Sequence, residues 1–245
     1  MTTPLTPLAA AGPSVEWYLT RSTGAVALLL LTLALALGVA DVQRWSSPRW
    51  PRFLLDALHR NVSLLALAFL LLHILTSILD SFAHISLLDA LIPFVGSYRP
   101  LWLGLGTVAF DLMLAVILTS LLRRRVGERG WRLTHWLVYA SWPIALLHSL
   151  GTGSDVKSAW LQILALGCLA LVIAAILLRT LPGFTRERAR ERGLALGATA
   201  AFVAGLLVWL PQGPLGSEWA RRSGTPASLL PHASSSASAS TGVRR

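Results

Sequence analysis

Four of the six histidines in this 245-residue chain fall within two long apolar segments. His59 and His73 are 14 positions apart, and His135 and His148 are 13 positions apart. At about 1.5 Å per residue, each pair would be separated by some 20 Å along a helix. Imidazole is costly inside a membrane, which indicates function, and it is a common axial ligand of haem iron. The spacing therefore predicts two haems at two depths, each bound between one histidine of the first segment and one histidine of the second.

The two segments that carry the histidines are expected to be the second and fourth spanning helices, which would run in the same direction. His59 would then meet His135 near one face of the membrane, and His73 would meet His148 near the other. Two axial histidines would make each iron six-coordinate, which suits electron transfer. The competing interpretation is that these imidazoles only pack between helices and bond to backbone carbonyls.

The spacing of 13 residues in the fourth segment does not return to the same helix face. At about 100° per residue, 14 residues come back to within ~40°, whereas 13 residues miss by ~140°. Pro143 lies between His135 and His148 and removes one helical hydrogen bond, from the carbonyl of Tyr139. We therefore expect either a distorted fourth helix or two porphyrins turned relative to each other.

Composition identifies the elements that would position these histidines. The chain is 54% hydrophobic and only 13% charged, about half the charged share of a soluble domain. Its apolar residues form runs of the length that a helix needs to cross roughly 30 Å of hydrocarbon. The predicted fold is an all-α, polytopic membrane helix bundle with two haems between helices 2 and 4. Its six transmembrane helices are expected at Tyr18–Ala40, Phe53–Leu79, Leu101–Leu122, Trp131–Leu150, Ala159–Leu178 and Leu194–Leu210.

The basic residues predict the orientation of these helices. The net charge of +10 comes almost entirely from arginines in the connections between apolar runs, a pattern that indicates topology and argues against nucleic-acid binding. The second and fourth connections hold only Arg99 and Lys157, and the N-terminal flank holds Arg21. The odd connections hold Arg44, Arg49, Arg52, Arg60, Arg123, Arg124, Arg125, Arg129, Arg132, Arg179, Arg186, Arg188, Arg190 and Arg192. These loops should face the cytoplasm, and both termini should lie outside a plasma membrane.

The remaining segments are expected to be tails and connections. Residues 1–17 should form an outer N-terminal tail without a cleavable signal peptide, and 181–210 a cytoplasmic loop with the sixth helix. Residues 211–245, rich in Ser, Ala and Pro, should form a disordered outer tail. Cys168 is the only cysteine, which excludes intramolecular disulfides and iron–sulfur ligation. The use of arginine in place of lysine points to a bacterial origin.

Four arginines are candidates for binding the haem propionates, because a guanidinium matches a carboxylate with two hydrogen bonds. Arg60 and Arg132 stand beside the cytoplasmic histidines, where topology alone also explains them. Arg21 and Arg99 should lie at the outer face, against the positive-inside rule, which favours a functional role.

Other candidates are weaker. Asp111 in the third span should face the bundle interior and make a structural hydrogen bond, or else relay protons. His84, in an outer loop, could contact an acceptor or a metal ion, but a lone loop histidine is usually just solvated. Gly24, Gly104 and Gly106 could admit a porphyrin face or a neighbouring helix.

The pattern His59-x13-His73 followed by His135-x12-His148 resembles the ferric reductase-like transmembrane domain. This domain occurs in ferric reductases, NADPH oxidases and the haem-binding membrane subunit of the periplasmic methionine sulfoxide reductase system. The resemblance covers roughly residues 18–180, and the flanks Leu58-His59-Arg60 and Arg21-Ser22-Thr23-Gly24 are also similar. It implies two haems b and electron flow from a cytoplasmic reduced flavin or flavoprotein to an outer acceptor, which could be ferric iron, a quinone, oxygen or a protein.

The chain also departs from the larger members of that family. No GxGxxG motif occurs in a βαβ context, so any flavin or NAD(P)H site is expected on a partner. The predicted role is the electron-transfer subunit of an oxidoreductase, with no catalytic side chain of its own. The main alternative is a haem-free transporter or membrane scaffold that uses the histidines for protons or packing. A haem-based redox sensor is a third hypothesis, which is disfavoured because the short C-terminal tail is expected to hold no folded signalling module.

Overall fold

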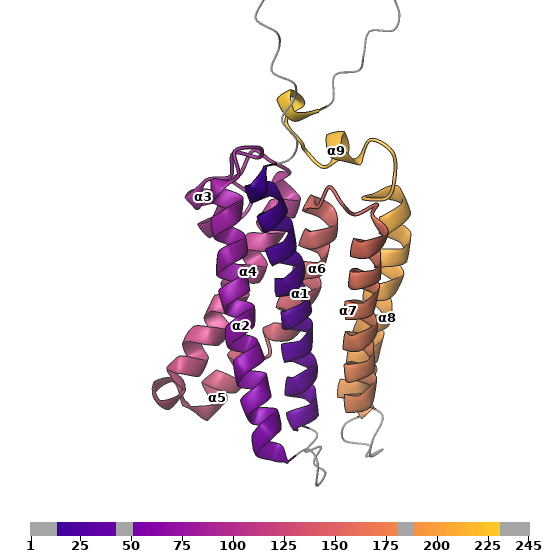
Figure 1. Ribbon diagram of the computed structural model, residues 1–245. Coiled ribbons are helices and arrows are strands. Elements are labelled where there is room, and N and C mark those ends of the chain that lie inside the picture. Colours follow the sequence, from indigo (N-terminus) through magenta and orange to yellow (C-terminus); the bar gives the residue numbers. More distant parts are fainter. Residues whose placement is uncertain (1–13, 43–50, 181–188, 231–245) are drawn as a thin grey trace, which may run out of the picture.

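The computed structural model describes residues 14–42, 51–180 and 189–230, and this part of the chain is helical and contains no strand. The all-α prediction is therefore confirmed. The long helices stand side by side as a bundle (Figure 1). They are α1 (Val15–Val42), α2 (Arg52–Leu79), α4 (Pro100–Leu121), α6 (Val138–Thr152), α7 (Ala159–Thr180) and α8 (Ala189–Gln212). Shorter helices are α3 (Leu87–Leu91), α5 (Arg123–His135) and α9 (Trp219–Arg222).

Five of these helices, α1, α2, α4, α7 and α8, are long and apolar enough to cross a membrane. The fourth expected span, Trp131–Leu150, is not one continuous helix, because the chain divides it into α5 and α6. With 15 residues, α6 is about 22 Å long, less than the hydrocarbon thickness of roughly 30 Å. Five of the six expected spans thus form single helices of spanning length, whereas the fourth is divided between the end of α5 and the shorter α6, which packs inside the bundle.

The division between α5 and α6 lies at Trp136 and Leu137, several residues before Pro143. Here the backbone bonds tighten to a three-residue spacing: the amides of Leu137 and Tyr139 donate to the carbonyls of Thr134 and Trp136, at 3.0 and 3.1 Å. This is the pattern of a 3₁₀ turn. Pro143 itself lies inside α6. The fourth segment is therefore distorted, and the distortion changes the direction of the chain just after His135, where α5 leaves the bundle (Figure 1).

The core of the bundle forms around α1, which packs against α2, α6 and α7. Leu28 and Leu35 of α1 contact a buried cluster that includes Leu146 and Cys168. One polar contact crosses this core: the Trp142 indole Nε1 donates to the hydroxyl of Thr32 at 2.8 Å. On the other side, α4 packs against α6 and α5, and α8 packs on α7. Helices α1, α2, α4 and α6 thus enclose the space between the histidine-bearing segments.

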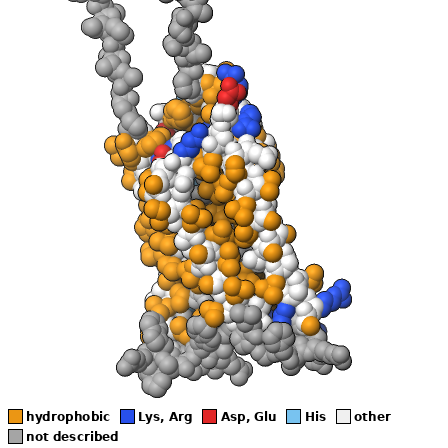
Figure 2. All heavy atoms as spheres, turned by 90° about the vertical axis from the view of Figure 1, so that its right-hand side faces the viewer, with side chains coloured by type: hydrophobic (Ala, Val, Ile, Leu, Met, Phe, Trp, Pro, Cys, Tyr) orange, Lys and Arg blue, Asp and Glu red, His pale blue; other side chains and the backbone are white. Residues whose placement is uncertain are grey.

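The flank formed by the C-terminal helices carries apolar side chains over most of its height, with charges gathered toward the two ends (Figure 2). Ile163, Leu166, Leu207 and Val208 are more than 60% exposed. Such a surface suits contact with lipid acyl chains. We refer below to the α3 end and the α5 end of the bundle, which lie at opposite ends of α2 and α4 (Figure 1).

Two expectations differ from the structure. Asp111 is exposed on α4 and lines neither of the hollows beside the histidines, so it does not face the bundle interior. Residues 211–230 do not form a disordered tail. They fold over the α3 end as α9 and a 3₁₀ turn, where the Trp219 indole donates to the carbonyl of Gly151 at 3.1 Å. The expected tails 1–13 and 231–245 lie outside the described residues, as do Arg44, Arg49, Arg186 and Arg188.

Candidate functional site: two imidazole pairs

The four intramembrane histidines lie as two facing pairs. At the α5 end, the rings of His59 and His135 have centroids 6.4 Å apart and planes inclined at 68°. At the α3 end, the rings of His73 and His148 have centroids 6.3 Å apart and planes inclined at 73°. The two members of each pair come from different helices: α2 contributes one imidazole, and α5 or α6 contributes the other. Two similar arrangements are thus repeated along the bundle axis.

Helix α1 holds both imidazoles of α2 in the same way. Nδ1 of His73 lies 2.8 Å from the carbonyl oxygen of Thr20, and Nδ1 of His59 lies 2.9 Å from that of Ala34. Four residues after each carbonyl comes a glycine: a Cβ added to Gly24 would be 2.9 Å from the His73 ring, and one added to Gly38 would be 3.2 Å from the His59 ring. The glycines therefore allow each ring to rest directly against α1.

Helix α4 holds His148 by the same arrangement. The His148 Nδ1 lies 2.8 Å from the carbonyl oxygen of Trp102 and 3.3 Å from the hydroxyl of Thr152. Gly106 follows four residues after Trp102, and a Cβ there would be only 2.5 Å from the ring. We call this combination of a carbonyl at one position and a glycine four residues later a carbonyl–glycine seat.

The seats determine which ring nitrogen is free. A carbonyl oxygen can only accept a hydrogen bond, so Nδ1 of His59, His73 and His148 must carry the proton and donate it. In a neutral imidazole, the lone pair then resides on Nε2. The hydrogen bond also fixes the ring orientation and raises the basicity of that nitrogen, which is the usual second-shell arrangement of a metal-binding histidine.

His135 is the exception. Its Nδ1 is buried and has no hydrogen-bond partner in the described part of the chain. The ring packs instead against the indole of Trp131, one helical turn earlier, with centroids 5.0 Å apart and planes inclined at 30°.

Apolar hollows flank the His73–His148 pair on two sides. One is lined by residues of α1, α6 and α7, including Gly24, Leu28 and Leu161, and opens toward Arg21 and Asp155. The other is lined mainly by α2 and α4, including Ile74, Gly106, Phe110 and Met113. Both imidazoles line both hollows.

Arg21 and Arg99 lie at the α3 end, as their positions predict, but their surroundings differ. Arg21 lines the first hollow, where it pairs with Asp155 and has its guanidinium carbon 3.6 Å from the Trp17 ring centroid. Arg99 is buried and is engaged by the protein, since it donates to the carbonyls of Gly151 and Thr152 at 3.1 and 3.0 Å. Its Nε also donates to Thr225 at 3.0 Å. Arg21 thus lines the hollow, whereas Arg99 links the C-terminal segment around Thr225 to the bundle.

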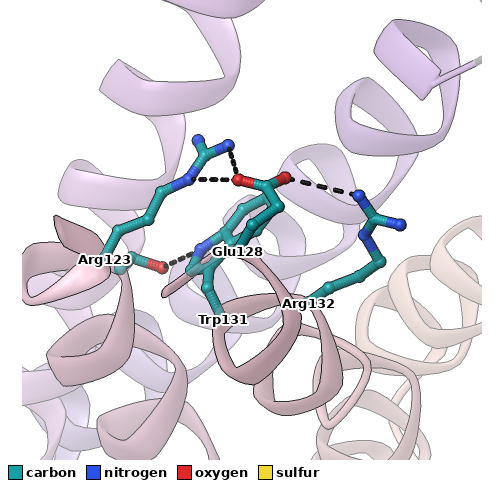
Figure 3. A network of polar contacts seen from close by, with 5 residues as sticks. Arg123, Glu128, Trp131 and Arg132 are labelled. Atoms are coloured by element: carbon teal, nitrogen blue, oxygen red, sulfur yellow. Dashed lines mark hydrogen bonds and ion pairs between the residues drawn. The ribbon is translucent and has the colours of Figure 1, made fainter. Parts of the chain in front are cut away.

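Arg60 and Arg132 lie at the α5 end and are both exposed. Arg132 approaches Glu128 at 3.4 Å, and Glu128 also accepts a 2.7 Å hydrogen bond from Arg123 (Figure 3). The Arg123 guanidinium carbon is 4.1 Å from the Trp131 ring centroid. This network contacts Trp131, which packs on His135, and it reaches the histidine pair only through Trp131.

His84 is exposed in the loop before α3, with a positive φ of 49°. His232 lies outside the described residues. Among the residues that the structure describes, no three His, Cys, Asp or Glu side chains converge as a group.

Residues 23–146 match the model of the family described as ferric reductase like transmembrane component. The chain belongs to this family. No curated protein and no solved structure matches the chain. The family match includes His59, His73 and His135 and ends two residues before His148.

In this ferric reductase-like chain, sequence reasoning identified Gly24 and Gly106 only as small residues with two possible uses, and it missed Gly38. A signal for them exists. Gly24 and Gly38 are separated by 14 positions, the same interval as His59 and His73. Equal intervals on two helices packed as a hairpin bring each glycine beside one histidine. Trp131 and Ser120 were also missed, because no spacing rule distinguishes them from ordinary interfacial residues.

Proposed function

We propose that this ferric reductase-like chain binds two haems b, one between His59 and His135 and one between His73 and His148, and carries electrons across the membrane. The donor is a cytoplasmic reduced flavin or flavoprotein, and the acceptor lies outside. The observation that carries the proposal is the separation within each imidazole pair.

That separation supports ligation of one metal ion by both rings. A metal bond to an imidazole nitrogen is about 2.0–2.1 Å long, and the ring centre lies about 1.1 Å further, so two rings on opposite sides of one ion should have centroids about 6.3 Å apart. The two pairs measure 6.4 and 6.3 Å. This separation also lies within the 4.5–7 Å range of ordinary aromatic contacts, so the proposal depends equally on the ring nitrogens that the backbone carbonyls leave free.

The surroundings of the rings support the same proposal. Three imidazoles have Nδ1 bonded to a carbonyl, which leaves Nε2 as the ligand atom. Apolar hollows flank the His73–His148 pair, where the faces of a porphyrin need apolar contact. Arg21, at the mouth of one hollow, is the arginine best placed to bind a propionate, in exchange for its pairing with Asp155.

A bound haem supplies one-electron chemistry that no side chain here can perform. The four imidazoles would hold the two groups at their depths in the bundle, the carbonyl–glycine seats restrict ring rotation, and the apolar walls would exclude water. The 14-residue interval on α2 places the two levels about 21 Å apart along the helix. We place the α5 end in the cytoplasm, because Arg60 and the arginines of α5 lie there. Both termini then lie outside a bacterial plasma membrane.

Transfer across a sealed bilayer tests this function. We would reconstitute the purified chain in vesicles that enclose ferricyanide and add dithionite outside, which reads electron flow regardless of protein orientation. Wild-type protein should consume the enclosed ferricyanide, whereas His59→Ala and His73→Ala, each lacking one of the two levels, should not. A haem-free wild-type chain, or equal ferricyanide consumption by the variants, would count against the proposal and would favour a transporter or scaffold.

A further inference from the structure

The fourth imidazole, His135, is held differently from the other three, and the difference has a structural origin on α4. The two seats on α1 begin at Thr20 and Ala34, 14 residues apart. The same interval on α4, counted from the seat at Trp102 and Gly106, leads to Val116 and Ser120. A serine therefore stands where the glycine of a fourth seat would be.

Ser120 uses the carbonyl that a fourth seat would offer. Its hydroxyl donates to the carbonyl oxygen of Val116 at 2.7 Å. The same hydroxyl accepts a 3.2 Å hydrogen bond from the indole Nε1 of Trp131. The site that could have held His135 thus holds Trp131.

Trp131 in turn packs on His135, with ring centroids 5.0 Å apart. It is further fixed from α5 itself: the guanidinium of Arg123 lies over the indole, and Glu128 binds Arg123 (Figure 3). The Trp131 ring is therefore restrained by both Ser120 and Arg123. The buried Nδ1 of His135 has no partner in the described residues that could restrain the ring instead.

We propose that Trp131, tethered by Ser120, is the positioning residue of His135, and that aromatic packing here replaces the carbonyl–glycine seat used by the other three imidazoles. This inference rests on the proposed two-haem function. Its consequence is an unequal pair of sites. The α3-end site has two ligands whose basicity is raised by a hydrogen bond to a carbonyl, and the α5-end site has one. The haem at the α5 end should therefore have the higher midpoint potential.

The test compares Trp131→Leu with Trp131→Phe in the full chain, and Trp136→Leu serves as the matched control. Trp136 directly follows His135 in the chain, is 56% exposed, and its ring packs on Tyr139. The readouts are the low-spin signals of the two haems in electron paramagnetic resonance and the two midpoint potentials. Because the His73–His148 haem lies at the other end of the bundle, its retention shows that each variant is folded.

Trp131→Leu should lower the affinity for the α5-end haem by up to about tenfold, the size expected for one aromatic stack, and should leave the other haem unchanged. Trp131→Phe should largely restore it, and Trp136→Leu should resemble wild type. The proposal is overturned if Trp131→Leu alters neither haem or both, if Phe fails to rescue, or if wild-type potentials are equal or reversed. Absence of haem from wild-type protein would instead defeat the proposed function.

Discussion

Replacement of Gly106 by alanine tests the seat that the structure makes tightest. The added Cβ would lie 2.5 Å from both Cε1 and Nδ1 of His148, whereas non-bonded carbon atoms ordinarily approach to about 3.5–4.0 Å. The ring must therefore retreat by about 1 Å. Since Nδ1 is one of the displaced atoms, its 2.8 Å hydrogen bond to the Trp102 carbonyl is lost as well.

The expected cost follows from these two effects. Overpacking costs about 1–3 kcal/mol, and the lost hydrogen bond about 1 kcal/mol. The sum of roughly 2–4 kcal/mol corresponds to an affinity for the α3-end haem about 30- to 700-fold lower. Gly24→Ala and Gly38→Ala, with Cβ contacts of 2.9 and 3.2 Å, should have progressively smaller effects.

The assay is the haem-to-protein ratio of the detergent-purified variants, with Gly167→Ala as control because a Cβ there meets nothing within 4 Å. Gly106→Ala should retain about one haem. Adding His73→Ala should remove no further haem, because both changes act on one site, whereas adding His59→Ala should remove the rest. The reasoning fails if Gly106→Ala keeps two haems, or if its haem loss is additive with that of His73→Ala.

Three further predictions concern residues around the site. Arg99→Ala should lower the melting temperature by releasing the segment around Thr225 from the α3 end, since hydrogen bonds from a charged donor contribute about 1.5–3 kcal/mol each. Both haems should remain bound. Thermal melting of samples with equal haem content checks this prediction. The hydrogen bond from Arg123 holds the pKa of Glu128 below the ordinary value of a glutamate. This contact therefore stabilises the folded chain at pH values above the ordinary glutamate pKa, and its stabilisation is lost as the pH falls through the lowered pKa of Glu128 in the folded chain. Trp131 fluorescence should therefore change on acidification, and Glu128→Gln should abolish the change. Asp111→Leu should leave the haem spectrum unaltered because the side chain is exposed on α4 away from the hollows; a lost or shifted haem band would show that it faces the site.

Much of the arrangement of the histidines could be predicted from sequence because two regular periods act together. Apolar runs located the helices α1, α2, α4, α7 and α8 to within a few residues at most ends. A rise of 1.5 Å per residue then placed His59 and His73 at two levels. The 13-residue interval between His135 and His148 predicted either a distorted fourth helix or two porphyrins turned relative to each other, and the fourth segment is distorted at Trp136.

Two features could not be predicted: the position of the break between α5 and α6, and the hydrogen-bond partners of the residues around the histidines. Pro143 is the expected site of a kink, yet it is accommodated inside α6, and the chain rewinds at Trp136 instead. At this break α5 packs against α4, a tertiary contact that a one-dimensional pattern does not encode. Charge and side of the membrane made Arg99 a candidate for propionate binding, whereas its hydrogen bonds to carbonyls of α6 are tertiary contacts that the sequence pattern does not encode.

The number of haems bound per chain tests the central claim most directly. We would measure the reduced-minus-oxidised spectrum and the haem-to-protein ratio of wild-type protein, of His73→Ala and of the double variant His59→Ala/His73→Ala. The account predicts b-type spectra with about two, one and no haems. A wild-type chain with one haem or none, or a double variant that still binds haem, would contradict the assignment of the two imidazole pairs.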